Sequence, residues 1–434
     1  MNIISYHDGH TATACLISNG KILACVSEER FTRKKCQMGY PRNSINYCLE
    51  ELPAKNIDLV IVNGKKPPDP MQIRTSHSTF FSVKDLINFQ YNFFKPILIE
   101  GRKFNDVYSE FFKPMFNKIN FPSTGYDDMD KVNWVYDPSE DSQKFRELQI
   151  KTICKHLNVE KNQIKFIEHH PAHAAYAYFG SPFRTEDTLI FTLDGIGEDI
   201  NATISIAKND KIEEKFRTGD ANLGRLWKYI TLLLGMMPDQ HEFKIMGLAP
   251  YASTKHSNNV LETFEKNFIY IDDIEFKYSK KPKDLYFYFK KLFEGTRFDN
   301  IAGGLQKYTE KLISTWVKNA IKKYNISRIV FSGGVSMNIK LNKVLASLKE
   351  VKEFYVSPSG GDETLPLGVY YKCFGETYTP AFENIYLGPC YNKNDTLNIL
   401  SLNKKKLTFK SNVSNKDVAI LLANGDVVAR FDGR

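Results

Sequence analysis

The chain has little cysteine, few histidines and no long apolar run. Its seven cysteines are odd in number and never spaced Cys-x-x-Cys, which argues against a disulfide frame or a cysteine zinc site and favours a reducing compartment. No apolar stretch approaches the roughly 18–20 residues of a membrane span. The start, MNIISYHDGH, lacks the basic and apolar regions of a secretory signal. We therefore expect a cytoplasmic protein with no membrane partner.

The 434-residue chain carries a net charge of +9, from 59 Lys and Arg against 50 Asp and Glu. The lysines are scattered, and no nucleic-acid-reading module accompanies them. A solvated lysine-rich surface, or attraction of small anionic substrates, accounts for the charge. We expect no nucleic-acid partner, and the length predicts more than one compact unit.

Two stretches of the chain share one order of predicted elements. Residues 2–30 read as strand, His-Asp-Gly loop, strand, Asn-Gly turn and strand, and residues 187–219 repeat this order with a Gly-rich acidic loop. Further buried strands follow in each half, at residues 57–64 and 328–335. This duplication is the layout of an actin-like ATPase or sugar kinase, in which the ligand lies between the halves. The predicted fold class is α/β with a duplicated actin-like domain.

Residues 65–135 interrupt the first half with aromatic and basic residues, several prolines and no regular period. We interpret them as an inserted helical lobe. Its phenylalanines are expected to form a small core of their own, and a ligand wall is the alternative.

Three of the nine histidines crowd into FIEHHPAHAAYAYFG, residues 166–180. Proline favours the first turn of a helix, so His169 and His173 should face one way, as two-histidine metal clamps do. Asp194 and Asp362 each follow a predicted strand beside glycines, where an unpaired carboxylate is costly to bury. Together these four residues predict a site for iron, manganese or zinc. The alternative is capping or core histidines and two aspartates that cap turns.

Three Gly-rich loops, each at a strand end, are the phosphate-binding candidates. Backbone amides without side chains in the way can surround a phosphate, and a helix start adds a favourable dipole. The loops are HDGHTA, DGIGE and SGGVSMN, and the glycines of SPSGGDET add a fourth place where a ligand can approach the backbone. The candidates are Asp8, Gly9, Gly195, Gly197, Glu198, Gly333, Gly334, Val335, Asn338, Gly360 and Gly361.

Two further stretches carry charges that could face an anion. Lys244, in HEFKIMGLAPY, is a candidate for a phosphate or carboxylate partner, or an ordinary surface lysine. Residues 27–35, SEERFTRKK, are either a solvated loop or a basic rim of the cleft.

These stretches resemble the O-carbamoyltransferases of nodulation and antibiotic biosynthesis. The matching pieces run in family order over nearly the whole chain, and their combination is highly specific. One departure is His10, which intrudes where the family has a small residue. The matching pieces are HDGHTATACLISNGKI, EERFTRKK, FIEHHPAHAAYAYFGSPF, LDGIGE, FKIMGLAPY, FSGGVSMNIKLN and SPSGGDETLPLG.

The resemblance implies a Kae1-like domain over residues 1–380 that handles carbamoyl-adenylate made from ATP and carbamoyl phosphate. The carbamoyl group then passes to a hydroxyl of a small-molecule acceptor. The resemblance also implies a divalent metal, iron(II) ahead of manganese or zinc, held by the positions matching His169, His173, Asp194 and Asp362.

In the same resemblance the loop 333–338 contacts the adenosine part of the adenylate. A metal beside the carbamoyl group makes physical sense because it polarises the carbonyl. His170 or His7 is expected to accept the hydroxyl proton.

Residues 381–434 resemble the incomplete start of a YrdC-like domain. If adenylate formation belongs to that domain, this chain is expected to be competent for the transfer half-reaction alone. Two alternatives remain: a small-molecule kinase or ATPase of the same broad fold, and a nucleotide- or metal-binding module without catalysis. The sequence leaves open the acceptor and whether the chain forms a homo-oligomer.

Overall fold

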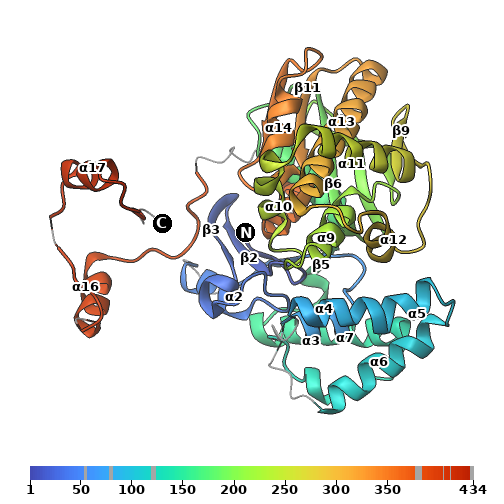
Figure 1. Ribbon diagram of the computed structural model, residues 1–434. Coiled ribbons are helices and arrows are strands. Elements are labelled where there is room, and N and C mark those ends of the chain that lie inside the picture. Colours follow the sequence, from blue (N-terminus) through green and yellow to red (C-terminus); the bar gives the residue numbers. More distant parts are fainter. Residues whose placement is uncertain are drawn as a thin grey trace. The chain divides into compact units, whose positions relative to one another are not determined.

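The computed structural model describes residues 1–52, 56–77, 82–118, 124–376, 384–403, 405–410 and 412–430. The chain divides into two compact units, Met1–Glu383 and Asn384–Arg434 (Figure 1). Among the described helices, none combines the length and apolarity that a membrane crossing requires.

The first unit contains two five-stranded sheets. In the first, β1 pairs with β2 and β2 with β3 in antiparallel fashion, whereas β1–β4 and β4–β5 are parallel. The parallel strands therefore end at one edge of the sheet. In spatial order the strands are β3 (Lys21–Ser27), β2 (Thr13–Ser18), β1 (Asn2–His7), β4 (Leu59–Asn63) and β5 (Ile164–Ile167).

The second sheet repeats this arrangement, with two antiparallel pairs followed by two parallel pairs. The mixed α/β fold with two sheets is thus confirmed, and both sheets have the same strand order. In spatial order the strands are β8 (Lys211–Thr218), β7 (Ile200–Lys208), β6 (Thr188–Gly197), β11 (Arg328–Ser332) and β12 (Glu353–Val356).

Two helices lie between the sheets and join them. Helix α15 (Leu365–Phe374) packs on β1 and β4, α8 (His169–Phe179) packs on β6 and β11, and the two helices pack on each other. A Cβ at Gly368 would lie 2.4 Å from the carbonyl oxygen of Ala172, so the helices cross too closely for a side chain there. The alanine-rich sequence after the histidines serves this packing, and it fixes the first turn of α8 at the sheet edges.

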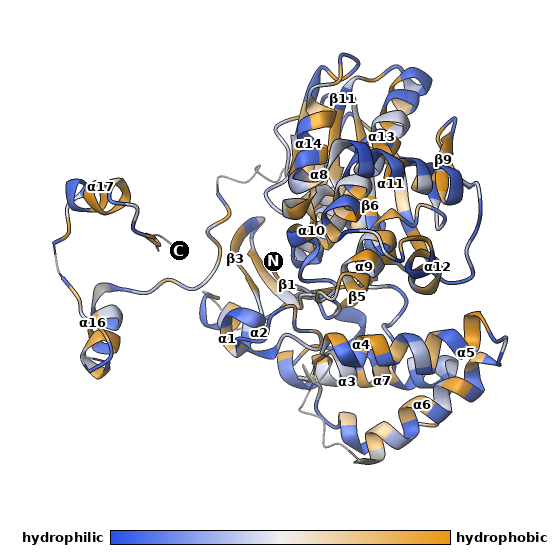
Figure 2. Cartoon of the chain, viewed as in Figure 1, coloured by the Kyte–Doolittle hydropathy of each residue, from blue (hydrophilic) through white to orange (hydrophobic). Residues whose placement is uncertain are grey.

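The outer faces of the sheets are covered by other helices. Alternate residues of the first sheet pack against α2 (Arg42–Glu50) and α7 (Pro138–Leu157). The second sheet packs on a larger hydrophobic core, much of it supplied by the long α13 (Phe298–Tyr324) (Figure 2). The other elements of this half are α9 (Leu223–Leu233), α10 (Glu242–Leu248), η4 (Ala249–Tyr251), α11 (Thr254–Asn267), β9 (Ile269–Asp272), β10 (Glu275–Tyr278), α12 (Leu285–Leu292), η5 (Gly334–Met337), α14 (Ile339–Ala346) and η6 (Asp362–Thr364).

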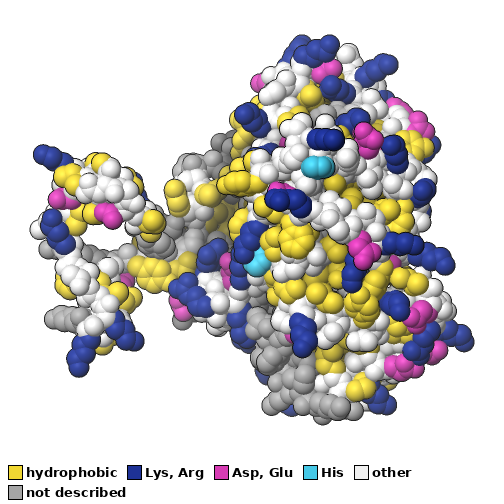
Figure 3. All heavy atoms as spheres, in the orientation of Figure 1, with side chains coloured by type: hydrophobic (Ala, Val, Ile, Leu, Met, Phe, Trp, Pro, Cys, Tyr) yellow, Lys and Arg dark blue, Asp and Glu magenta, His cyan; other side chains and the backbone are white. Residues whose placement is uncertain are grey.

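The described part of the stretch from 65 to 135 is largely helical, and its aromatic side chains pack on one another around Phe93, Tyr108 and Phe112. Tyr91 also packs edge-on against Phe287 of α12, and hydrophobic side chains gather over α9 and α12 on this face (Figure 3). The elements are α3 (Pro70–His77), α4 (Val83–Phe89), η1 (Gln90–Phe94), α5 (Lys95–Leu98), α6 (Phe104–Lys118) and η2 (Met129–Lys131). Elsewhere in the first half are α1 (Glu29–Thr32) and η3 (Lys161–Gln163).

The second unit contains two short helices, α16 (Lys393–Leu402) and α17 (Asn415–Ala423). Each begins with a capping box, from Asn392 and Ser414 respectively. Large apolar side chains such as Leu402 and Leu422 are exposed in this unit. The YrdC-like character of residues 381–434 stays a prediction, and residues 381–383, 404, 411 and 431–434 lie outside the described part.

Glu28, in the stretch considered as an anion-binding rim, anchors the start of α2. Its carboxylate is buried and accepts hydrogen bonds from the backbone amides of Asn43 and Ser44 at 3.1 and 2.8 Å, and from both of their side chains. Amides in the first turn of a helix have no partner within the helix, so the carboxylate satisfies donors that would otherwise be buried unpaired.

We expect Glu28→Ala to lower the free energy of unfolding by about 3 kcal/mol, because the buried amide and hydroxyl of Ser44 and the two donors of Asn43 lose their acceptor. Urea denaturation measures this change. Glu50→Ala, an exposed position on the same helix, is the control and should stay within about 0.5 kcal/mol of wild type. Equal stability of the two variants would show that the cap contributes nothing.

Candidate functional site

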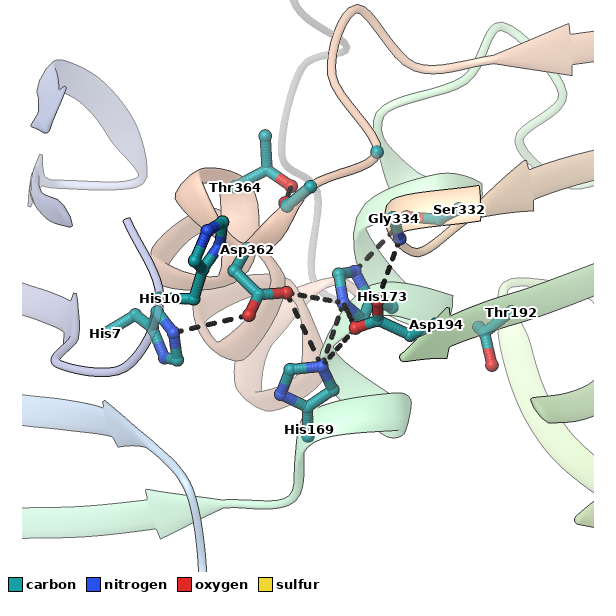
Figure 4. A network of polar contacts seen from close by, with 12 residues as sticks. His7, His10, His169, His173, Thr192, Asp194, Ser332, Gly334, Asp362 and Thr364 are labelled. Atoms are coloured by element: carbon teal, nitrogen blue, oxygen red, sulfur yellow. Dashed lines mark hydrogen bonds and ion pairs between the residues drawn. The ribbon is translucent and has the colours of Figure 1, made fainter. Parts of the chain in front are cut away.

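Four side chains predicted from separate motifs meet at the facing edges of the two sheets. His169 and His173 come from the first turns of α8, Asp194 from the end of β6, and Asp362 from η6 after β12 (Figure 4). One ligand atom from each lies within 4.8 Å of all the others. The structure thus brings together all four residues that the sequence predicts as metal ligands.

The contacts within this cluster are short. His169 Nε2 lies 2.9 Å from Asp194 Oδ2 and 3.6 Å from Asp362 Oδ1. The corresponding distances from His173 Nε2 are 3.5 and 3.4 Å, and the two imidazole nitrogens are 3.1 Å apart. Ligands of one ion at about 2.0–2.2 Å stand about 3–4 Å from each other, so the donor set fits a divalent metal.

Contacts behind the cluster fix the orientation of its members. Asp194 Oδ1 accepts the backbone amides of Gly195 at 2.7 Å and Gly334 at 3.2 Å, which turns Oδ2 toward the histidines. His173 Nδ1 lies 3.4 Å from Ser332 Oγ, which leaves Nε2 for the cluster. Supporting contacts of this kind are typical of metal ligands.

Electrostatics couples the four groups. Burial and the charge of Asp362 would raise the pKa of Asp194, but hydrogen bonds from His169 and His173 outweigh both and lower it. Burial would lower the pKa of His173, yet its hydrogen bonds to the two carboxylates raise it to about 9. The pKa of Asp362 is lowered against burial by the charge of His169, by a hydrogen bond from His173 and by the charge of His7. The cluster therefore stabilises positive charge beside the carboxylates.

His7, at the end of β1, faces the same cluster. Its Nε2 lies 3.6 Å from Asp362 Oδ2, and the ring is buried with no hydrogen-bond partner on either nitrogen among the described residues (Figure 4). A Cβ at Gly9 would lie 2.6 Å from His7 Cε1, so this glycine leaves room for the ring. His7 is placed to exchange a proton with a ligand.

His170 does not face the cluster. Its Nδ1 lies 2.7 Å from Thr192 Oγ1 and its Nε2 lies 3.0 Å from the carbonyl oxygen of Ile200. Burial and the neighbouring histidines His169 and His173 lower its pKa to about 3. Because both nitrogens are occupied by the protein, we retain His7 and not His170 as the candidate base.

Several predicted phosphate-loop glycines make room for neighbouring side chains and backbone. A Cβ at Gly197 would lie 2.3 Å from His169 Cδ2, and a Cβ at Gly334 would lie 2.8 Å from Asp194 Oδ1. A Cβ at Gly360 would lie 1.8 Å from Ser336 Oγ. Gly333 has a φ of 91° and lies against the carbonyl oxygen of Leu193. Gly361 lies against Glu363, whereas Gly195 faces open space.

Other candidates from the same loops are used within the protein. Asp8 is buried and accepts hydrogen bonds from Tyr126 and from Gln149 Nε2. Glu198 accepts the backbone amide of His169 at 2.9 Å, at the start of α8. Val335 belongs to the hydrophobic core of the second half, and Asn338 caps α14 by accepting the amide of Leu341 at 3.0 Å.

Lys244 is exposed on α10, with its ammonium 5.9 Å from the ring of Phe243. Lys35, from the first half, lies 5.6 Å from the same ring. His10, the departure from the family pattern, places Nε2 3.1 Å from the carbonyl oxygen of Asp239. The first loop therefore contacts the second half beside the cluster.

Sequence reasoning did not single out Ser332 and Thr192, which orient His173 and His170. The signal was present but weak: both lie in or directly beside the motifs SGGVSMN and LDGIGE, at the ends of buried strands.

Comparison with known proteins identifies the family of the chain. The sequence model of the family "Carbamoyltransferase N-terminus" matches residues 2–369. The chain belongs to this family, and the resemblance to the nodulation and antibiotic-biosynthesis carbamoyltransferases is confirmed.

Individual relatives are distant. The chain is 25% identical to an uncharacterized protein of Synechocystis over 100% of its own length and 68% of that protein. It is 23% identical to the nodulation protein NolNO of Sinorhizobium fredii over 88% of its length, and spans 49% of that relative. Among solved structures, the activator of 2-hydroxyisocaproyl-CoA dehydratase from Clostridium difficile, with bound ADPNP, is similar with a TM-score of 0.40 and 12% identity, covering 89% of this chain and 99% of that one.

We expect Gly197→Ala to weaken divalent-metal binding about 10- to 100-fold, because the added methyl group displaces the ring of His169. Competition with a chromophoric chelator measures the affinity. Gly195→Ala is the matched control, since its Cβ meets nothing within 4 Å, and it should bind metal like wild type. Equal affinities for both variants would contradict the assigned ligand set.

Proposed function

We propose that this chain catalyses the transfer of a carbamoyl group to a hydroxyl of a small-molecule acceptor, with carbamoyl-adenylate as the donor. The observation that carries the proposal is the convergence of His169, His173, Asp194 and Asp362, with the unpartnered His7 beside them. Family membership supports carbamoyl transfer as the reaction class.

The proposed step is a nucleophilic substitution at the carbamoyl carbon. The acceptor oxygen bonds to that carbon, the bond from the carbon to the bridging phosphate oxygen breaks, and AMP leaves with the bonding electron pair. The hydroxyl proton passes to His7 Nε2, and Asp362 Oδ2, 3.6 Å from that nitrogen, stabilises the imidazolium that forms.

A divalent ion held by His169, His173, Asp194 and Asp362 supplies Lewis acidity for the carbamoyl carbonyl. Two imidazoles and two carboxylates suit iron(II), manganese(II) or zinc, and we propose iron(II) first. ATP and carbamoyl phosphate are the proposed source of the adenylate. The loop 333–338 is the proposed adenosine contact, because it follows β11 and lies beside Asp194, to which its Gly334 amide donates a hydrogen bond.

The direct test supplies the iron(II)-loaded chain with carbamoyl-adenylate and a panel of sugars, nucleosides and other hydroxylated acceptors. We expect a carbamate ester of at least one acceptor, detected by mass spectrometry, and its loss after the metal is removed by a chelator. Formation of AMP without any ester across the panel would contradict the transferase proposal.

His7→Gln should lower kcat about 100- to 10,000-fold, because it removes the proton acceptor, while the free energy of unfolding stays near that of wild type. His170→Ala should do the reverse: it removes the buried ring and its contacts with Thr192 and the carbonyl oxygen of Ile200, and lowers the free energy of unfolding by about 1–3 kcal/mol. Steady-state kinetics and urea denaturation of both variants check the pair. A larger loss of kcat in the His170 variant would reverse the two roles.

A further inference from the structure

Asn63 is a buried carboxamide that the protein leaves unpartnered. It is the last residue of β4, 3% exposed, and neither Oδ1 nor Nδ2 has a hydrogen-bond partner among the described residues. Asn201, equally buried, shows the usual situation: its Nδ2 donates to the carbonyl oxygen of Gly219 and its Oδ1 accepts the amide of Ala221. Buried polar groups are nearly always paired, so the exception at Asn63 requires an explanation.

The sheet register places Asn63 at the candidate site. Tyr6 pairs with Val62, so the next residues, His7 and Asn63, lie side by side in the sheet. On its other side Asn63 pairs with Ile167, which is two residues before His169 in the chain. Strand ends at this edge supply the site with His7 and the first turn of α8.

The alternation of side chains gives the face on which Asn63 lies. Leu59 and Ile61 of β4 belong to the same hydrophobic cluster as Ile3 of β1, on the side of the sheet that α15 covers. Asn63 is two residues after Ile61 and His7 is four residues after Ile3, so both occupy this same face. His7 contacts Asp362, the first residue of η6, and η6 directly precedes α15. Asn63 therefore lies on the face where the cluster is built.

We propose that Asn63 recognises the carbamoyl group itself, an inference that rests on the proposed function. A carbamoyl group presents an N–H donor and a carbonyl acceptor on one edge, as a primary amide does. The carboxamide of Asn63 is its complement: Oδ1 accepts a hydrogen bond from the carbamoyl NH₂, and Nδ2 donates one to the carbonyl oxygen. Asn63 is therefore a specificity-determining residue that selects carbamoyl over acetyl, which has a methyl group in place of NH₂.

The test uses two stable analogues of the adenylate in which a methylene replaces the bridging anhydride oxygen. One is the 5′-adenosyl ester of carbamoylmethylphosphonate, and the other is its acetonyl counterpart with CH₃ in place of NH₂. By calorimetry, wild type should bind the carbamoyl analogue at least about 10-fold more tightly, because a site built around hydrogen bonds rejects a ligand that leaves them unpaired. Asn63→Leu should abolish this preference, chiefly by weakening the carbamoyl analogue.

A stability measurement separates recognition from a structural role. Asn63→Leu removes no hydrogen bond within the protein, so its urea midpoint should equal or exceed that of wild type. Thr152→Val, which removes another buried unpartnered hydroxyl, on α7, is the matched control and should leave both affinities unchanged.

The outcomes are distinct. If Asn63→Leu keeps the wild-type preference for the carbamoyl analogue, the assignment of Asn63 is overturned. A large loss of stability with unchanged affinities would also overturn it, because that result would indicate that Asn63 binds a structural water. If wild type binds neither analogue, the adenylate site of the proposed function fails, and the assignment of Asn63 fails with it. If wild type forms the carbamate ester but binds both analogues equally well, the proposed function stands and only the role of Asn63 is contradicted.

Discussion

Two carboxylates held against two imidazoles are the constraint on which the rest of the structure depends. Asp194 and Asp362 repel each other when both are ionised, and partial burial increases the cost. The cluster is stable only with compensating positive charge, from protonated histidines or from a cation. The raised pKa of His173 reflects that demand. A divalent ion meets it with two charges at one point, while leaving both imidazoles neutral.

The duplicated fold is what places these groups against each other. Each sheet ends its parallel strands at one edge, and helices α8 and α15 hold the two edges face to face. His7 ends β1 and the first turn of α8 follows β5, both strands of the first sheet. Asp194 lies near the end of β6 and Asp362 follows β12, both strands of the second. No single half contains the site. A shift of one half against the other would separate the carboxylates from His7 or from His169.

Much of this could be predicted from the sequence because strand ends and helix spacing are local properties. The spacing of His169 and His173, and the strand-end positions of Asp194 and Asp362, gave four residues that the structure brings together. The partners of Asp8 could not be predicted, since Tyr126 and Gln149 lie more than a hundred residues away in the chain. The glycines were predicted to let a phosphate approach the backbone, which stays a prediction; at several of them the approaching groups are protein side chains, such as the ring of His169 at Gly197. Asn63 was missed, although a polar residue closing the buried run LVIVN was a visible signal.

The central claim is that one ion is bound by four side chains from both halves of the fold. Anomalous diffraction at the iron edge, from crystals of the iron(II)-loaded chain grown without oxygen, tests it most directly. The account predicts a single strong anomalous peak within bonding distance of His169, His173, Asp194 and Asp362. A peak at another place, or these four side chains standing apart with no ion between them, would contradict it.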